Sequence, residues 1–227
     1  MPLRALVFDG EGVVIDTEGA WDHSQEVFMA RRGHPYDRSE VKPLLTGRGL
    51  SEGTEVLRKR FGLTEAAESL SRERLELMTR FFESEVDFIP GFKEFYGRVS
   101  GQYKTALATA LDPHLLRLAD YKLGLHRLFG GAIVSLADVG YRGKPFPDLF
   151  LRAAEILKVD AGECVVVEDS PLGIEAAGRA GMLSIGLATT YPRAALRGAT
   201  MVVRSYSEIE LREVQALSAR TVRPASP

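Results

Sequence analysis

The sequence has only one cysteine, Cys164, among its 227 residues. A single cysteine cannot form a disulfide within the chain. Cys164 begins an apolar run that continues through Val165, Val166 and Val167, so we expect it to be a small buried hydrophobic residue. These features favour a reducing compartment, and we predict a cytoplasmic location.

The sequence also lacks an excess of charge of either sign. Its 29 Lys and Arg residues face 31 Asp and Glu residues, for a formal net charge of -2. Binding to a phosphate backbone needs a basic excess, so we expect no nucleic acid partner. No stretch approaches the ~18 apolar residues of a membrane span, and Asp9 interrupts the first apolar run before a signal-peptide core is complete. We therefore expect no membrane partner.

Hydrophobic residues are plentiful, at 45% of the chain, and charged residues make up 26%. This composition is typical of a packed globular protein, and the length suits one large domain or one domain with a sizeable insertion. Residues 3–8 form an apolar run that predicts a buried strand ending at Gly10 and Gly12. From about residue 17 to residue 85 the apolar residues instead recur at helical spacing.

After Pro90 and Gly91 and a further amphipathic helix, strand and helix patterns alternate to the end of the chain. The predicted strands are residues 103–109, 132–135, 164–168, 183–188 and 201–203, and the predicted helices between them are 113–123, 147–157 and 171–180. Such alternation indicates an α/β fold: a Rossmann-like parallel sheet with helices on both faces. We predict a core domain of residues 1–16 and 87–219, an α-helical cap domain of residues 17–86 inserted after the first strand, and a flexible tail of residues 220–227.

Polar side chains follow the predicted strands, where ligands bind in open parallel sheets. Alone, each is better explained as a turn former, a helix cap or a solvated lysine. Together they supply acids, a hydroxyl group and an amine at one sheet edge, a combination that suits phosphoryl transfer with Mg²⁺. These residues are Asp9, Glu11, Thr109, Lys144, Glu168, Asp169 and Ser170. The histidines show no close metal-ligand spacing, so we expect surface or packing roles for His23, His34, His114 and His126.

Four ordered motifs resemble those of the haloacid dehalogenase-like hydrolases, within them the β-phosphoglucomutase and phosphoglycolate phosphatase group. They are the segment from Phe8 to Glu18, Thr109, the segment from Gly143 to Asp148, and the segment from Val167 to Ile174. With residues 17–86 as the cap, the resemblance extends from about Ala5 to Ser205. It implies the same fold, Mg²⁺ as cofactor and phosphate esters as substrates.

The resemblance also implies roles for individual residues. Asp9 would be the nucleophile that forms an aspartyl phosphate, and Lys144 would offset the repulsion between the two anions. Thr109 and the amides of Gly10 and Ala110 would hold the phosphoryl oxygens. The protein ligands of Mg²⁺ would be Asp9, Asp169 and the carbonyl oxygen of Glu11, with Glu168 beside them.

The predicted cap offers two further candidates. Residues 46–52 resemble the cap loop that approaches the substrate, where Arg48 could bind a substrate carboxylate or second phosphate. A surface arginine beside a helix cap at Ser51 explains the same residues. Glu18, at the start of the cap, is a candidate substrate-binding residue with the same alternative.

Glu11 departs from the family pattern, which has an aspartate as general acid at this position. Glutamate keeps the carboxyl group but moves it roughly 1.5 Å further out. General acid-base catalysis contributes about 10²- to 10⁴-fold, so this change bears directly on activity.

We predict a Mg²⁺-dependent phosphatase acting on a small phosphorylated metabolite, and we expect a monomer. A phosphosugar mutase is the main alternative. The resemblance places Trp21 where the mutases have a cap histidine, with His23 two residues on, and this disfavours the mutase without excluding it. A dehalogenase is less favoured, because Glu11, Glu168 and Asp169 preserve a metal-and-acid site. The third alternative is a binding or regulatory protein in which Glu11 has reduced turnover.

Overall fold

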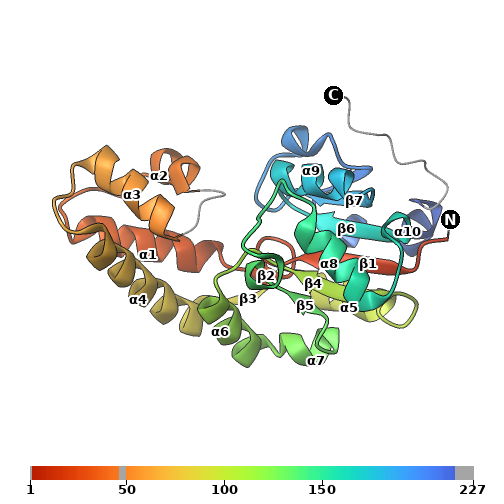
Figure 1. Ribbon diagram of the computed structural model, residues 1–227. Helices are drawn as coiled ribbons and strands as arrows, with labels where there is room; N and C mark the ends of the chain where they lie inside the picture. Colours follow the sequence, from red (N-terminus) through yellow and green to blue (C-terminus); the bar gives the residue numbers. More distant parts are fainter. Residues whose placement is uncertain (1, 46–49, 218–227) are drawn as a thin grey trace. The chain divides into compact units, whose positions relative to one another are not determined.

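The computed structural model describes residues 2–45 and 50–217. The described residues divide into two compact units, one formed by residues 2–16 with 87–217 and the other by residues 17–45 with 50–86. The first contains a six-stranded sheet and the second is helical (Figure 1). Arg48 and the predicted flexible tail lie outside the described residues.

The sheet of the first unit has the strand order β5-β4-β1-β6-β7-β8, and all its neighbouring strands are parallel. Its strands are β1 (Ala5–Asp9), β4 (Lys104–Ala108), β5 (Ile133–Val134), β6 (Cys164–Glu168), β7 (Leu183–Leu187) and β8 (Met201–Val203). The predicted α/β fold class, with its parallel sheet, is confirmed. Since β1 lies between β4 and β6, the chain extends from β1 first to one side and then to the other. Ligands bind at such a switch in strand order.

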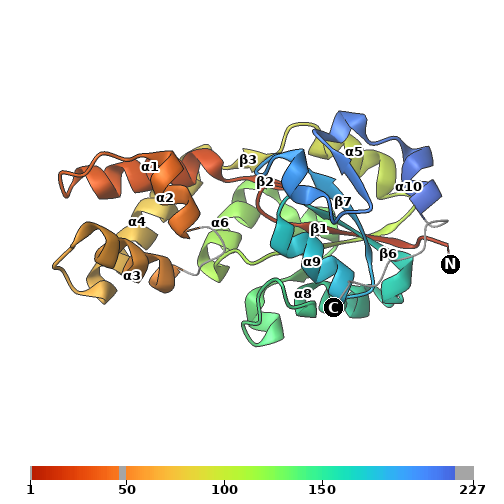
Figure 2. The same ribbon diagram turned by 90° about the horizontal axis from the view of Figure 1, so that it is seen from above.

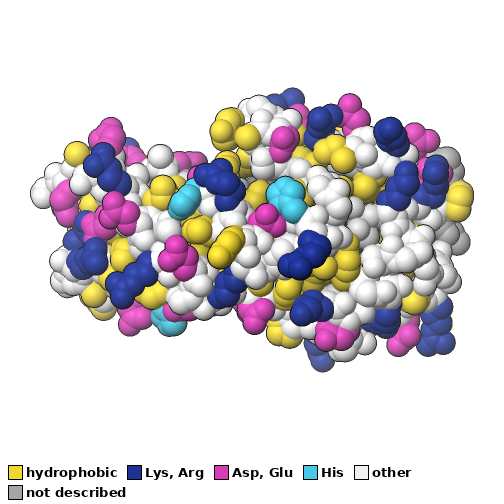
Figure 3. All heavy atoms as spheres, turned by 90° about the horizontal axis from the view of Figure 1, so that it is seen from below, with side chains coloured by type: hydrophobic (Ala, Val, Ile, Leu, Met, Phe, Trp, Pro, Cys, Tyr) yellow, Lys and Arg dark blue, Asp and Glu magenta, His cyan; other side chains and the backbone are white. Residues whose placement is uncertain are grey.

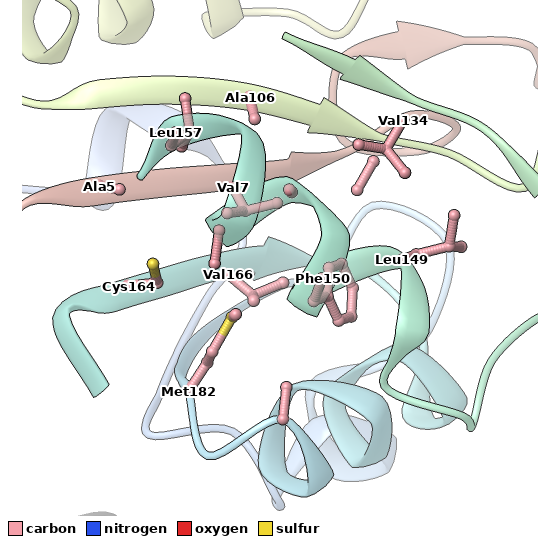
Figure 4. Packing of buried hydrophobic residues seen from close by; sticks show 14 of the residues in the cluster. Ala5, Val7, Ala106, Val134, Leu149, Phe150, Leu157, Cys164, Val166 and Met182 are labelled. Carbon is pink, nitrogen blue, oxygen red and sulfur yellow. The ribbon is translucent and has the colours of Figure 1, made fainter. Parts of the chain in front are cut away.

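Helices cover both faces of this sheet because alternate residues of β1 point to opposite sides. Ala5 and Val7 belong to the cluster under α8 (Asp148–Leu157) and α9 (Pro171–Arg179), which also includes Cys164, Val166 and Phe150 (Figure 4). Cys164 is fully buried there, as predicted.

Phe8 points to the other face of the sheet. Its ring lies 5.7 Å from Phe92 and 6.3 Å from Phe95, on α5 (Phe92–Val99). Among the described residues, the remaining α-helices of this unit are α6 (Pro113–Leu123), α7 (Leu125–Phe129) and α10 (Leu211–Leu217). Asp112 caps α6 by accepting a hydrogen bond from the His114 amide at 2.8 Å, ahead of Pro113 at the first helical position.

The helical unit consists of α1 (Glu18–Ala30), α2 (Arg38–Leu45), α3 (Leu50–Phe61) and α4 (Ala67–Glu85), seen from above in Figure 2. Its own hydrophobic core contains Phe28, Met29, Val41, Leu57, Leu63, Leu70 and Leu77. A separate core means that this unit buries its apolar faces by itself.

A two-stranded antiparallel pair joins the start and the end of the inserted segment. β2 (Ile15–Asp16) pairs with β3 (Asp87–Phe88), with Asp16 opposite Asp87. The chain therefore leaves the sheet-containing unit and returns to it at adjacent points.

The described surface agrees with the near-neutral composition. Figure 3 shows one face, on which basic and acidic side chains are interspersed. Among the described residues, no helix combines the length and the apolar composition that a membrane crossing requires.

Candidate active site

Asp9 ends the central strand β1, opposite Ala108 of β4, and is 6% exposed. Oδ1 of its carboxyl group lies 2.6 Å from Nζ of Lys144. Lys144 comes from the loop before α8, and its side chain is 11% exposed, so it is not an ordinary solvated lysine. The structure thus brings two predicted site residues from distant segments into contact.

Lys144 also donates a hydrogen bond to Oε1 of Glu168, the last residue of β6. Burial opposes the charge on Lys144, but the carboxylates of Asp9 and Glu168 outweigh burial and raise the pKa of the amine above its usual range. Lys144 is therefore a fixed positive charge between two acids.

Glu168 is fully buried, and Ser170 holds its other oxygen. The Ser170 amide donates to Oε2 at 2.6 Å and the Ser170 hydroxyl donates at 2.9 Å. Ser170 also caps α9 by accepting from the Gly173 amide at 3.1 Å. A Cβ atom at Gly173 would lie 1.8 Å from Oε1 of Glu168, so only glycine fits there. Ser170 therefore both caps α9 and fixes the Glu168 carboxylate.

Asp169, the residue after Glu168, lies against the loop that follows Asp9. It is 5% exposed, and a Cβ atom at Gly12 would lie 2.1 Å from its Oδ2 and 2.6 Å from Oγ1 of Thr190. Burial, followed by the charges of Glu168 and Asp9, raises the pKa of Asp169 well above its ordinary value, while a hydrogen bond from Thr190 acts in the opposite direction.

Asp9, Glu168 and Asp169 form a buried acidic cluster in which the candidate ligand oxygens all lie within 4.8 Å of one another. Burial raises the pKa of Asp9 to about 7, with Lys144 opposing this effect and Glu168 adding to it. A single lysine therefore does not neutralise the cluster. Buried carboxylates in this arrangement are suited to a hard divalent cation, which prefers oxygen ligands.

Thr109, Gly10 and Ala110 lie at the same edge of the sheet. Thr109 is fully buried just after β4, and its hydroxyl oxygen accepts a hydrogen bond from the Leu111 amide at 3.1 Å. A Cβ atom at Gly10 would lie 2.3 Å from that oxygen, so the Thr109 side chain occupies the space beside Gly10. Ala110 is exposed in the following loop.

Glu11 is half-buried, between Gly10 and Gly12, and forms an isolated backbone bridge with Ile15. Glu18 belongs to the helical unit, where its Oε2 accepts hydrogen bonds from Arg38 and Lys42. The Glu18 carboxylate is thus already ion-paired within the helical unit. Its role as a substrate-binding residue stays a prediction.

Three of the histidines make contacts typical of surface and packing residues. Nδ1 of His23 lies 2.8 Å from Glu85, Nδ1 of His126 lies 2.8 Å from Asp120, and the ring of His34 packs 5.3 Å from Phe61. Trp21 is half-buried on α1.

Two threonines contribute to the site although the sequence patterns did not single them out. Thr189 donates to the carbonyl oxygen of Gly12 at 2.5 Å, and Thr190 bonds to Asp169. Both follow β7, so the rule that collected polar residues after strands applies to them as well.

Comparison with known proteins adds independent support for the family. Residues 3–181 match the family described as haloacid dehalogenase-like hydrolase. The chain is 31% identical to β-phosphoglucomutase of Bacillus subtilis over 225 residues, covering 92% of each protein. It is 29% identical to a phosphorylated carbohydrates phosphatase of Thermotoga maritima over 181 residues, covering 79% of this chain and 82% of the relative.

A solved structure agrees. A haloacid dehalogenase family hydrolase of Deinococcus radiodurans, crystallised with bound phosphate and sodium, is 29% identical with a TM-score of 0.78, covering 96% of this chain and 97% of the other. The sequence match extends over most of the chain and the same fold is found, so the protein is an enzyme that belongs to the haloacid dehalogenase-like hydrolase family.

Proposed function

We propose that this protein is a Mg²⁺-dependent phosphatase that hydrolyses a small phosphorylated metabolite through an aspartyl phosphate on Asp9. The observation that supports this most strongly is the pairing of the Asp9 carboxylate with Lys144 beside two further buried acids. The names of several relatives refer to phosphorylated carbohydrates, fructose 1-phosphate or glycerol 3-phosphate, so a small phosphorylated polyol or sugar is the proposed substrate class.

The donor set suits Mg²⁺. Burial is the main cause of the raised pKa values of Asp9 and Asp169, and the three carboxyl groups of the cluster face one lysine, so a bound cation would stabilise their ionised forms. Asp9, Asp169 and the carbonyl oxygen of Glu11 would hold the ion, with Glu168 beside them. When bound, Mg²⁺ would neutralise these carboxylates and reduce the repulsion between Asp9 and a phosphate ester.

In the first step, a carboxylate oxygen of Asp9 attacks phosphorus and the bond from phosphorus to the ester oxygen breaks. Glu11 protonates the departing alkoxide, so the products are an alcohol and the aspartyl phosphate. Lys144 stabilises charge on the transferring group, and Thr109 with the amides of Gly10 and Ala110 holds its oxygens.

In the second step, Glu11, now ionised, accepts a proton from water, which attacks the phosphorus. Inorganic phosphate leaves, and Asp9 is regenerated as a carboxylate. Because Lys144 keeps its proton between two acids, it serves as a fixed charge in both steps and not as a proton donor.

The test begins with p-nitrophenyl phosphate, with and without Mg²⁺, and continues with a panel of sugar and polyol phosphates. Wild-type protein should release phosphate only with Mg²⁺, and Asp9→Asn should abolish turnover while the protein remains folded. Hydrolysis that persists in Asp9→Asn, or that is unchanged by a chelator, would contradict the mechanism.

A phosphosugar mutase is the second candidate, because the B. subtilis relative that aligns with 92% of the chain is named β-phosphoglucomutase. Trp21 argues against it, because the resemblance places this residue where the mutases have a cap histidine, and the nearest histidine, His23, follows two residues later. With β-glucose 1-phosphate and a sugar bisphosphate primer, we expect free phosphate. Efficient formation of glucose 6-phosphate would instead establish the mutase.

A further inference from the structure

The loop that follows Asp9 is a closed turn. The amides of Val14 and Ile15 both donate to the carbonyl oxygen of Gly10, at 2.8 and 2.9 Å, and the Gly12 amide donates to the carbonyl oxygen of Ile15 at 2.9 Å. Glu11 stands inside this turn, between two residues whose backbone groups are already bonded.

Beyond Glu11, three successive carbonyl oxygens each accept a hydrogen bond from a different segment of the same unit. Thr189 Oγ1, after β7, donates to Gly12 at 2.5 Å. The Tyr206 hydroxyl donates to Val13 at 2.9 Å, and the Ile89 amide, after β3, donates to Val14 at 3.0 Å. The sequence separation between Tyr206 and Val13 is 193 residues. The position of the turn therefore depends on parts of the chain that are remote from Asp9.

Tyr206 is well placed to act as a rigid anchor. It is 1% exposed, its ring packs 5.9 Å from Phe92 and 5.1 Å from Phe95, and its Cβ atom lies against Gly91, 3.2 Å from where a Cβ atom there would stand. Burial, followed by the charges of Asp169 and Asp9, raises the pKa of its phenol well above the usual range, so the hydroxyl keeps the proton that it donates.

We infer that Tyr206 is a positioning residue for the reaction: its hydroxyl fixes the loop that carries Glu11, and so sets where the Glu11 carboxyl and carbonyl groups stand relative to Asp9. This inference rests on the proposed function, in which Glu11 is the general acid and a metal ligand through its backbone. A displacement near 1 Å can cost about 10²-fold in rate, so one missing anchor has a measurable effect.

The test compares Tyr206→Phe with the matched control Tyr96→Phe. Tyr96 belongs to the same aromatic cluster, 5.4 Å from Phe92, and its hydroxyl also donates to a backbone carbonyl, that of Leu128, remote in sequence from the loop. Each substitution removes one hydroxyl group and keeps the ring, and the Tyr96 hydroxyl also lies 3.0 Å from Oγ1 of Thr105. Unfolding free energies measured for both variants correct for any general loss of stability, and a local effect should appear only in Tyr206→Phe.

Three measurements are made on both variants: kcat for an alkyl phosphate and for an aryl phosphate, the dissociation constant for Mg²⁺, and hydrogen exchange of amides 11–15. For Tyr206→Phe we expect ~10-fold lower kcat with the alkyl ester, a smaller loss with the aryl ester, ~3-fold weaker Mg²⁺ binding and faster exchange. Tyr96→Phe should leave the alkyl-to-aryl ratio and the exchange of these amides unchanged. Thr189→Ser keeps the hydroxyl donor and should keep the wild-type alkyl-to-aryl ratio and amide exchange. Thr189→Val lacks the donor and should change both, as Tyr206→Phe does.

The outcomes separate this inference from the proposed function. If the wild type hydrolyses no phosphate ester, the proposed function fails, and hydrogen exchange of amides 11–15 still decides whether Tyr206 orders the loop. Equal exchange in wild type and Tyr206→Phe would overturn the inference. In an active enzyme, faster exchange with an unchanged alkyl-to-aryl ratio would also overturn it, because Tyr206 would then be only structural.

Discussion

Gly12 lies against Asp169 so closely that a Cβ atom at Gly12 would stand 2.1 Å from the carboxylate oxygen Oδ2. The backbone of Gly12 also has a positive φ, 73°, which residues with a side chain adopt at a cost. Glycine is thus required here for two independent reasons: the backbone conformation, and the close contact with Asp169, a proposed metal ligand.

The substitution Gly12→Ala should therefore remove activity by displacing Asp169. Gly181 provides a matched control, since its φ is also 73° and, apart from its chain neighbours, no residue lies within 4 Å of its Cβ position. Both variants should lose about 1 kcal/mol of stability from backbone strain. Only Gly12→Ala should lose at least ~100-fold in kcat/KM together with Mg²⁺ affinity. Equal activity of the two variants, measured beside their unfolding free energies, would show that the contact with Asp169 does not matter.

Lys144→Met should destabilise the protein as well as inactivate it. Removing the amine leaves Asp9 and Glu168 as buried charges without their cation, which typically costs about 3 to 5 kcal/mol. The loss of unfolding free energy, measured with urea at pH 7, should shrink at pH 5, where Asp9 is protonated more readily. Adding Glu168→Gln should restore part of the stability but no turnover. A fully stable single variant would contradict this electrostatic account.

The raised pKa of Asp9, about 7 against an ordinary 3.8, predicts how the stability of the metal-free protein depends on pH. The folded state retains a proton that the unfolded state releases, so this group stabilises the fold below about pH 4. That stability is lost as the pH rises to about 7, by up to about 4 kcal/mol. Urea unfolding in a chelator should show the decline, and Asp9→Asn should reduce it. Identical pH profiles for wild type and variant would exclude Asp9 as its source.

Glu11→Asp tests whether the site has adapted to the longer side chain. The turn around Glu11 is bonded on both sides, so we expect that aspartate falls short of the leaving oxygen and that the rate with an alkyl phosphate decreases. Aryl phosphates, whose leaving oxygen needs no proton, should change less. Comparing kcat/KM for the two esters decides the question. An increase of about tenfold with the alkyl ester, about 1.4 kcal/mol of barrier, would show that glutamate is a misplaced acid.

The sequence predicted site residues best where a polar side chain directly follows an apolar run that has the pattern of a strand. Asp9, Thr109 and Glu168 each end or follow a buried apolar strand, and parallel strands bring their carboxyl ends to one edge. This rule predicted the acidic cluster, whereas Lys144 lies well beyond the end of β5 and was identified through the segment from Gly143 to Asp148. It applied equally to Thr189, which was not singled out because a threonine pair after a strand resembles an ordinary turn.

Other features had no local signal. β2 and β3 have two residues each, too few to show a strand period, and α7 has five, too few to show a helical one. The contact of Tyr206 with Val13 depends on packing between segments that are distant along the chain, so no short pattern in the sequence specifies it.

The pairing of β2 with β3 places the exit and the return of the inserted segment opposite each other, at Asp16 and Asp87. Neighbouring strands are only about 5 Å apart, so the sheet accepts an insertion of any length whose two ends meet at that spacing. We therefore expect that residues 17–86 can be lengthened, shortened or exchanged for those of a relative without altering the register of β1. The proposed chemistry at Asp9 and Lys144 is thus covalently independent of the length of the segment inserted between β2 and β3.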